Sequence, residues 1–110
     1  MAGNIVQMDD SNYKEILKSH PLVIVDTWAE WCAPCKAIAP VFERLAAQYS
    51  DRLTFAKVNT DENLDFARSF KVLSIPTFLV FKNGELVNKW SGAKPEKLTK
   101  EVKKLAEDDK

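Results

Sequence analysis

The 110 residues suit one compact domain, and a composition of 45% apolar and 29% charged residues excludes a disordered or collagen-like chain. The 16 basic and 16 acidic side chains balance, so we expect neither nucleic acid nor a membrane surface as a partner. No apolar run approaches the roughly 18 residues that span a bilayer, and the first residues lack the pattern of a signal peptide, so we expect a cytoplasmic protein.

The first part of the chain predicts a strand, a helix and a second strand. Residues 4–8 can form a short edge strand, and residues 10–18 have the apolar spacing of a helix. The stretch LVIVDTW at 22–28 is apolar on both alternating faces except at Asp26 and Thr27. This pattern is typical of a central parallel strand that is covered on both sides.

The middle of the chain predicts a long helix, a strand and a short helix. Residues 34–49 carry apolar side chains at helical spacing, and Pro40 inside this helix should kink it. Residues 53–59 predict the next strand. Residues 61–70 predict a short helix that begins with acidic side chains, which suit the positive end of a helix.

The last part of the chain predicts an antiparallel hairpin and a helix. Residues 77–90 read as two strands joined by Asn83 and Gly84, the pair preferred for a tight two-residue turn. An amphipathic helix follows from about Pro95. Parallel units followed by a hairpin predict an α/β fold, with a mixed sheet of five strands and four helices distributed over both faces.

The most informative motif is CAPC, which opens the long helix after the strand at 22–28. Unpaired backbone N–H groups and the positive helix end favour a thiolate at Cys32, and Pro34 suits the first helical turn. Cys35 lies one turn later on the same side, so the two sulfurs are able to form a bond. In open α/β sheets this edge, beyond the carboxyl ends of the parallel strands, carries the reactive site.

Two other uses of this cysteine pair are weaker. A structural disulfide that closes so short a loop stabilises by only roughly 2 kcal/mol in the chain-entropy model. A zinc site needs four ligands, whereas the chain offers Cys32, Cys35 and a remote His20, so zinc would require a dimer. Redox chemistry is therefore the favoured interpretation, and we expect no metal ligand set and no bound cofactor.

Six stretches together form a wider pattern: VDTWAEWCAPCK at 25–36, Pro40, Lys57, SIPT at 74–77, FKNG at 81–84 and SGAKP at 91–95. With them the chain resembles the thioredoxin family along nearly its whole length. The resemblance implies a single thioredoxin domain over residues 1–110 and a redox-active disulfide between Cys32 and Cys35. It also implies a monomeric thiol–disulfide oxidoreductase that reduces disulfide-containing proteins and is regenerated by a thioredoxin reductase.

Asp26 and Lys57 are the expected acid–base residues. Burial in the apolar strand should raise the pKa of Asp26, because it disfavours the charged carboxylate. The resemblance implies that Asp26, assisted by Lys57, takes the proton of Cys35. The alternatives are a buried ion pair without a catalytic role and, for Lys57, a side chain that reaches from a strand end to solvent.

A shallow apolar surface around the disulfide is expected to bind substrates. Its predicted members are Trp31, Ala33, Pro34, Ile75, Pro76, Gly92 and Ala93. The resemblance implies a cis bond before Pro76 and an extended substrate segment that pairs with the backbone of Ile75. A proline there can also simply mark a strand boundary. Trp28 is expected in the core, and His20 as an exposed loop residue.

Some positions depart from the usual family pattern. Ala33 replaces the commoner glycine, Leu73 and Ser74 replace a basic residue and a glycine, and Thr27 replaces a phenylalanine. We expect these changes to affect the choice of protein partner more than the redox chemistry. Two further functions stay open: a disulfide oxidase or isomerase, and a non-catalytic binding module that uses the apolar surface around Trp31.

Overall fold

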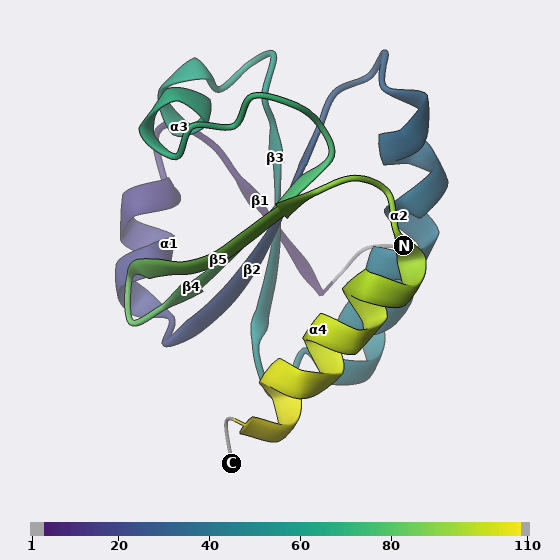
Figure 1. Cartoon of the computed structure of the whole chain (residues 1–110). Helices are drawn as coiled ribbons and strands as arrows, with labels where there is room; N and C mark the ends of the chain where they lie inside the picture. Colours follow the sequence, from purple (N-terminus) through teal and green to yellow (C-terminus); the bar gives the residue numbers. More distant parts are fainter. Residues whose placement is uncertain (1–3, 109–110) are drawn as a thin grey trace.

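One mixed sheet with helices packed on both faces makes up the computed structural model, which describes residues 4–108 (Figure 1). The strands lie in the order β1-β3-β2-β4-β5. The elements run β1 (Ile5–Met8), α1 (Tyr13–Ser19), β2 (Leu22–Trp28), α2 (Ala33–Tyr49), β3 (Thr54–Asn59), α3 (Leu64–Ser69), β4 (Thr77–Lys82), β5 (Glu85–Ser91) and α4 (Pro95–Asp108). The predicted fold class, with five strands and four helices, is confirmed.

Strand β2 lies at the centre of the sheet and carries Asp26 into the interior. It pairs in parallel with β3 and antiparallel with β4, and every residue before Trp28 is buried. In this register Asp26 lies directly beside Lys57 of β3 and Phe78 of β4. Because both faces of the strand are covered, nearly every position is apolar, as predicted.

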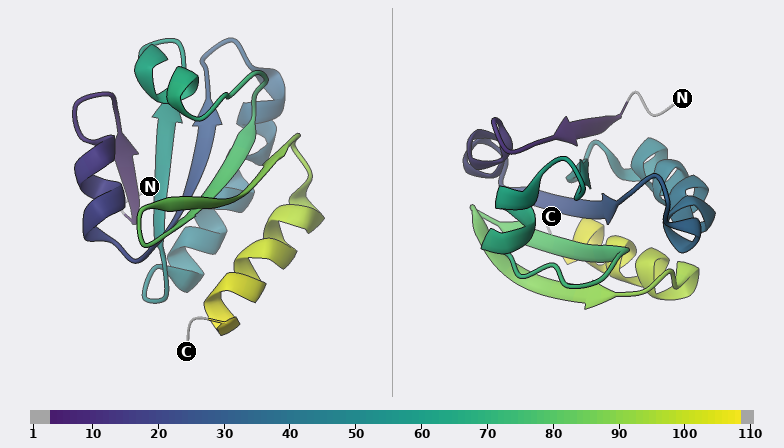
Figure 2. Two further views of the ribbon diagram at one scale, coloured as in Figure 1. Left: turned by 60° about the vertical axis from the view of Figure 1, so that its left-hand side comes forward. Right: turned by 90° about the horizontal axis from the view of Figure 1, so that it is seen from above.

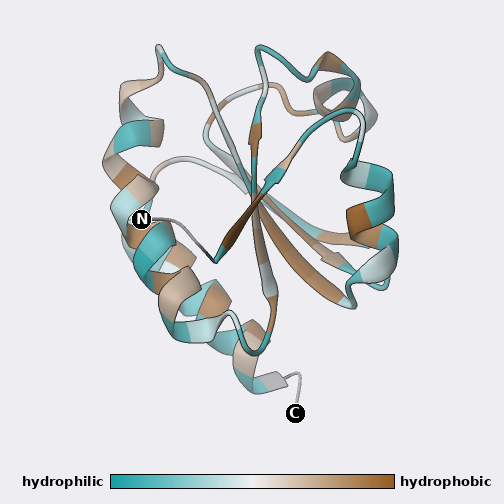
Figure 3. Ribbon diagram, turned by 180° about the vertical axis from the view of Figure 1, so that it is seen from behind, coloured by the Kyte–Doolittle hydropathy of each residue, from teal (hydrophilic) through white to brown (hydrophobic). Residues whose placement is uncertain are grey.

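Two apolar clusters hold the helices against the sheet. α2 and α4 cover the face that carries Phe55 and Phe78, whereas α1 and α3 cover the opposite face, where Tyr13 contacts Phe66 edge-on. Figure 2 shows the two helix pairs on opposite sides of the sheet, and Figure 3 shows apolar residues concentrated along the strands. Within residues 4–108, no helix combines the length and the apolar character needed to cross a membrane.

The hairpin between β4 and β5 has the predicted turn. Asn83 and Gly84 have φ angles of 53° and 85°, so both occupy the left-handed region that this turn type requires. The pairing shifts by one residue between Val80 and Phe81, which marks a β-bulge. The two strands of the hairpin are confirmed, and β5 forms one edge of the sheet.

The first helix starts later than the sequence suggested. The helix expected over 10–18 begins at Tyr13. The carboxylate of Asp9 accepts the backbone N–H groups of Ser11 and Asn12 and thereby holds these residues in a turn. Such local hydrogen bonds compete with the helix, which explains the difference.

The third helix is also shorter than the predicted 61–70. It begins at Leu64, and its first turn is satisfied by an acidic residue from another part of the chain. The Asp10 carboxylate accepts the N–H groups of Asp65 and Phe66 at 3.1 and 2.9 Å. The expected stabilisation of the positive helix end therefore comes largely from Asp10 rather than from the acids preceding the helix.

Candidate redox site

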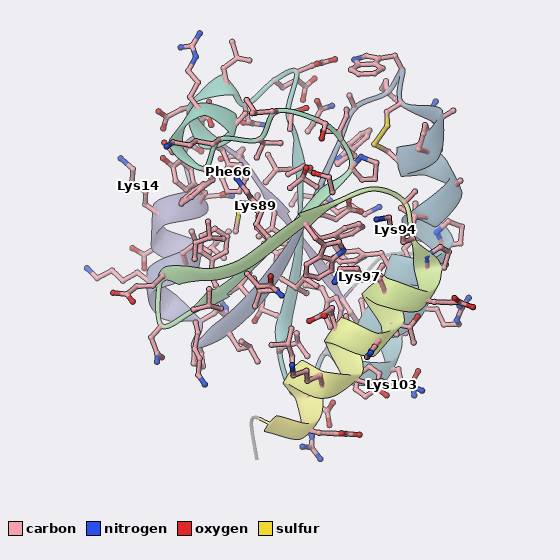
Figure 4. All side chains as sticks on the ribbon, viewed as in Figure 1. Lys14, Phe66, Lys89, Lys94, Lys97 and Lys103 are labelled. Atoms are coloured by element: carbon pink, nitrogen blue, oxygen red, sulfur yellow. A yellow bond between two sulfur atoms is a disulfide. The ribbon has the colours of Figure 1, made fainter. Side chains whose placement is uncertain are left out.

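Cys32 and Cys35 form a disulfide at the start of α2. Cys32 is the N-cap, and its sulfur accepts the N–H group of Cys35 at 3.2 Å. Pro34 lies in the first turn, where its missing N–H group costs nothing. Both cysteines are nearly buried, and the S–S bond is visible as the yellow bond beside the upper end of α2 (Figure 4). The predicted position of the pair is confirmed.

The two sulfurs have different neighbours. The Sγ atom of Cys32 lies 3.9 Å from the carbonyl oxygen of Ile75, which precedes Pro76 through a cis peptide bond. The Sγ atom of Cys35 lies 4.0 Å from the carbonyl oxygen of Thr27, at the end of β2. Cys32 is therefore next to the loop before β4, whereas Cys35 faces the interior of the sheet.

Asp26 is buried, and its Oδ1 atom has no hydrogen-bond partner in the described residues. Burial raises the pKa of this carboxyl to about 7, and the positive charge of Lys57 opposes the rise. Asp26 and Cys35 line the same cavity, which has a volume of about 230 Å³. Its lining residues are Asp26, Trp28, Glu30, Cys35, Lys36, Ala39 and Lys57.

Comparisons with known proteins agree on one family. The Thioredoxin family model matches residues 4–104. The thioredoxin of Staphylococcus haemolyticus is 47% identical over 98 residues, which cover 89% of this chain and 93% of the relative. The chain belongs to the thioredoxin family. The predicted family, the thiol–disulfide oxidoreductase function and the protein-disulfide reductase activity are thus confirmed.

Solved thioredoxin structures show the same fold. The structure of the Malassezia sympodialis thioredoxin has a TM-score of 0.88 at 32% identity, with 94% of each chain covered. The structure of the Plasmodium falciparum thioredoxin has a TM-score of 0.85 at 38% identity, with 92% of this chain and 97% of that chain covered. The predicted thioredoxin fold is therefore confirmed as well.

The residues expected to bind substrates lie around the thioredoxin disulfide with different exposure. Trp31 is 71% exposed, although its indole N–H donates to the Asp61 carboxylate at 2.8 Å. Ala33 and Pro34 are exposed, whereas Ile75 is half-buried and packs against the cysteine pair. Trp31, Ala33 and Pro34 therefore form an exposed rim around the nearly buried Cys32.

Gly92 and Ala93 directly follow β5, and Gly92 contacts the cis-proline loop. The N–H group of Gly92 donates to the carbonyl oxygen of Pro76 at 2.9 Å, and its φ of 107° is one that L side chains rarely adopt. Ala93 is half-buried and packs against the core on the α2 and α4 side. The glycine at position 92 is therefore required by the backbone of this loop itself.

A hollow of about 170 Å³ beside Trp31 includes residues that the sequence analysis did not assign to the surface. It is lined by Trp31, Thr60, Val72, Leu73, Ser74 and Ile75. Leu73 is 94% exposed, the highest value among the exposed large apolar residues in the described part of the chain. The signal available in the sequence was an apolar residue, Leu73, in the short segment that leads to Ile75 and Pro76.

Two interactions of the site were not predicted. Lys57 forms its ion pair with Glu43 of α2, with Nζ and Oε2 3.7 Å apart. The hydroxyl of Thr27 accepts the N–H group of Thr77 and donates to its carbonyl oxygen, both at 2.8 Å, and so ties β2 to the start of β4. Neither interaction had a local signal in the sequence, because each one joins segments that lie far apart in the chain.

Two remaining predictions concern aromatic residues. Trp28 is half-buried and packs against the cysteine pair, close to its predicted core position. His20 was expected to be an exposed loop residue; it does lie in the loop after α1, but the predicted exposure is wrong. Its ring is half-buried, and Nδ1 lies 2.9 Å from the carbonyl oxygen of Ile16, because the histidine closes the end of α1.

Proposed function

We propose that this thioredoxin-family chain reduces disulfides of cytoplasmic proteins through Cys32 and Cys35, with Asp26 as the proton acceptor. The observation that carries the proposal is the shared cavity: Cys35 and Asp26 line one space, and Cys32, bonded to Cys35, lies next to the cis-proline loop. A nucleophile, a second thiol and a base are thereby arranged in the order in which the reaction needs them.

In the first step, the reduced protein attacks the substrate. The Cys32 thiolate, favoured by the N–H groups at the start of α2, bonds to one sulfur of the substrate disulfide. The substrate S–S bond breaks, and its second sulfur leaves as a thiolate that takes up a proton. The product is a mixed disulfide between Cys32 and the substrate.

In the second step, Cys35 releases the substrate. Its thiol gives its proton to the Asp26 carboxylate across the cavity, and the resulting thiolate attacks the Sγ atom of Cys32. The mixed disulfide breaks, and the second substrate sulfur leaves as a thiol after protonation. The substrate gains two electrons, and the chain ends with the Cys32–Cys35 disulfide. Lys57 lines the same cavity, and its positive charge keeps part of the Asp26 population in the carboxylate form that can accept the proton.

Substrates bind as an extended segment along the loop before β4. The backbone of Ile75 pairs with this segment, and Pro76 supports it from below, as in strand addition. The exposed rim of Trp31, Ala33 and Pro34 contacts the segment on the other side of Cys32. Gly92 and Ala93 border the surface at its far end, where small side chains leave room for the substrate backbone.

The electrons come from a thioredoxin reductase. A relative from Mycobacterium leprae, named a bifunctional thioredoxin reductase/thioredoxin, is 43% identical over 94 residues, which are 20% of that protein. This fusion supports a reductase as the partner of the present chain. We further propose that residues 1–110 form a single monomeric domain that acts in cytoplasmic electron transport and redox homeostasis without a bound cofactor.

The proposal is tested by coupling the chain to a bacterial thioredoxin reductase, NADPH and insulin as the disulfide substrate. Steady NADPH oxidation that requires the chain, the reductase and insulin together is the expected result. Replacing the reductase by glutathione and glutathione reductase is the control. Faster turnover with glutathione, or oxidation of reduced insulin by the chain, would favour a disulfide oxidase or isomerase instead.

Leu73 is expected to influence which substrates bind. Replacing it with arginine removes an exposed apolar contact beside the 170 Å³ hollow. For a disulfide peptide with a leucine next to the cysteine, KM should rise about fivefold with little change in kcat, as expected for the loss of roughly 1 kcal/mol of apolar contact. A peptide with aspartate in that place should not show the rise.

The control for Leu73→Arg is Val87→Arg, which places the same charge on an exposed apolar position of β5. Val87 lies nearer to the hairpin turn than to the disulfide. Steady-state kinetics with both peptides compare the variants. An unchanged ratio of the two KM values in Leu73→Arg would show that Leu73 does not contribute to substrate choice.

A further inference from the structure

The ion pair between Lys57 and Glu43 connects the exposed face of α2 to the buried Asp26. The Lys57 ammonium lies 3.7 Å from the carboxylate of Glu43, and the two side chains are 14% and 42% exposed. On β3, Lys57 is also the direct neighbour of Asp26 on β2. The positive charge of Lys57 can therefore interact with two carboxylates, that of Asp26 in the interior and that of Glu43 at the surface.

The two carboxylates compete for this charge. The Oδ1 atom of Asp26 has no hydrogen-bond partner in the described residues, so the buried carboxylate is poorly compensated. A lysine side chain is flexible, and its ammonium can move along the cavity that it shares with Asp26. The contact with Glu43 holds the ammonium toward the outer side, where it stabilises the charged Asp26 less.

We propose that Glu43 is a positioning residue, which keeps the proton affinity of Asp26 high by drawing the Lys57 ammonium toward the surface of α2. The inference deepens the proposed function and rests on the role of Asp26 as the proton acceptor for Cys35. Without Glu43, Lys57 turns toward Asp26 and favours the carboxylate. Asp26 then releases its proton at lower pH and becomes a weaker base.

The test leaves the other charged side chains around Asp26 unchanged. Besides Lys57, the charged side chains that line the cavity are Glu30 from the loop after β2 and Lys36 from α2. The neighbouring residue on β4, Phe78, carries no charge. In the disulfide form neither cysteine titrates, so the proton equilibrium of Asp26 is observed without interference from a thiol.

The experiment follows the side-chain carboxyl carbon of Asp26 by NMR during a pH titration of the oxidised protein. Glu43→Gln is expected to lower the midpoint by roughly half a pH unit, the worth of a partly exposed ion pair. Lys57→Gln is expected to raise the midpoint, because Lys57 stabilises the carboxylate. In the double variant, the effect of Glu43→Gln should almost vanish, since Glu43 acts through Lys57.

The control is Glu85→Gln, which removes an exposed carboxylate at the hairpin end of the sheet and should leave the midpoint unchanged. A midpoint that Glu43→Gln does not move would overturn the proposal. A shift that persists undiminished in the Lys57→Gln background would overturn it as well, because Glu43 would then act by its own charge rather than by positioning Lys57.

Kinetics separate this inference from the proposed function. The pH profile of insulin reduction should move to lower pH in Glu43→Gln by the same amount as the Asp26 midpoint. If the midpoint moves and the profile does not, the action of Glu43 on Asp26 is supported, whereas the role of Asp26 in the second step fails.

Discussion

Replacing Cys32 with serine is expected to reduce the rate of insulin reduction by dithiothreitol to the uncatalysed background. A serine hydroxyl is not ionised near neutral pH and cannot form the mixed disulfide that the first step requires. Cys35→Ser, once reduced and freed of dithiothreitol, should react with insulin only as far as this step. Because the protein then has no second thiol to release the substrate, mass spectrometry should detect insulin chains bound to Cys32.

The control for the two cysteine variants is Ala37→Ser, which introduces a serine on the exposed side of α2 and leaves both sulfurs in place. It should reduce insulin at the wild-type rate. Equal rates for wild type and Cys32→Ser would contradict a catalytic role of the disulfide. A mixed disulfide on Cys35 rather than on Cys32 would reverse the assigned order of the two thiols.

Asp26→Asn is expected to stabilise the protein above neutral pH. The rise of the Asp26 pKa from 3.8 to about 7 means that the folded state holds a proton which the unfolded state has already lost. The free energy of unfolding therefore falls as pH rises from about 4 to 7, by roughly 4 kcal/mol in total. Asparagine resembles the protonated carboxyl and carries no such penalty.

Urea unfolding of the oxidised proteins at acidic and at mildly alkaline pH measures this effect. The stability advantage of Asp26→Asn over the wild type should grow by up to roughly 4 kcal/mol between the two conditions. The same variant should release reduced substrate up to roughly 100-fold more slowly near neutral pH, because it has lost its general base. Parallel pH dependences of stability in the two proteins would contradict a buried, protonated Asp26.

Features encoded by neighbouring residues could be predicted from the sequence. The apolar strand around Asp26, the Asn83-Gly84 turn and the cysteine pair at the start of α2 each depend on local spacing and backbone preference. These signals are physical: a strand covered on both faces has few polar positions, and a proline fits the first helical turn. The order of such elements was enough for the fold class.

Features that depend on contacts between distant segments could not be predicted in the same way. Asp10 satisfies the first turn of α3 from more than 50 positions away in the chain, and Thr27 holds the start of β4 at Thr77 from 50 positions away. The residues next to Asp10 and Thr27 in the sequence give no indication of these partners. The preference of Lys57 for Glu43 likewise depends on how α2 lies over β3, which only the packed structure defines.

The proposed function requires that the start of α2 holds Cys32 as a reactive thiolate while Cys35 stays protected behind it. The most direct measurement is alkylation of the reduced protein by iodoacetamide near neutral pH, with the modified residue identified by mass spectrometry. We expect Cys32 to react first and much faster than a free cysteine, whose thiol is mostly protonated near neutral pH. Alkylation of Cys32 at the rate of free cysteine, or preferential alkylation of Cys35, would contradict the proposed function.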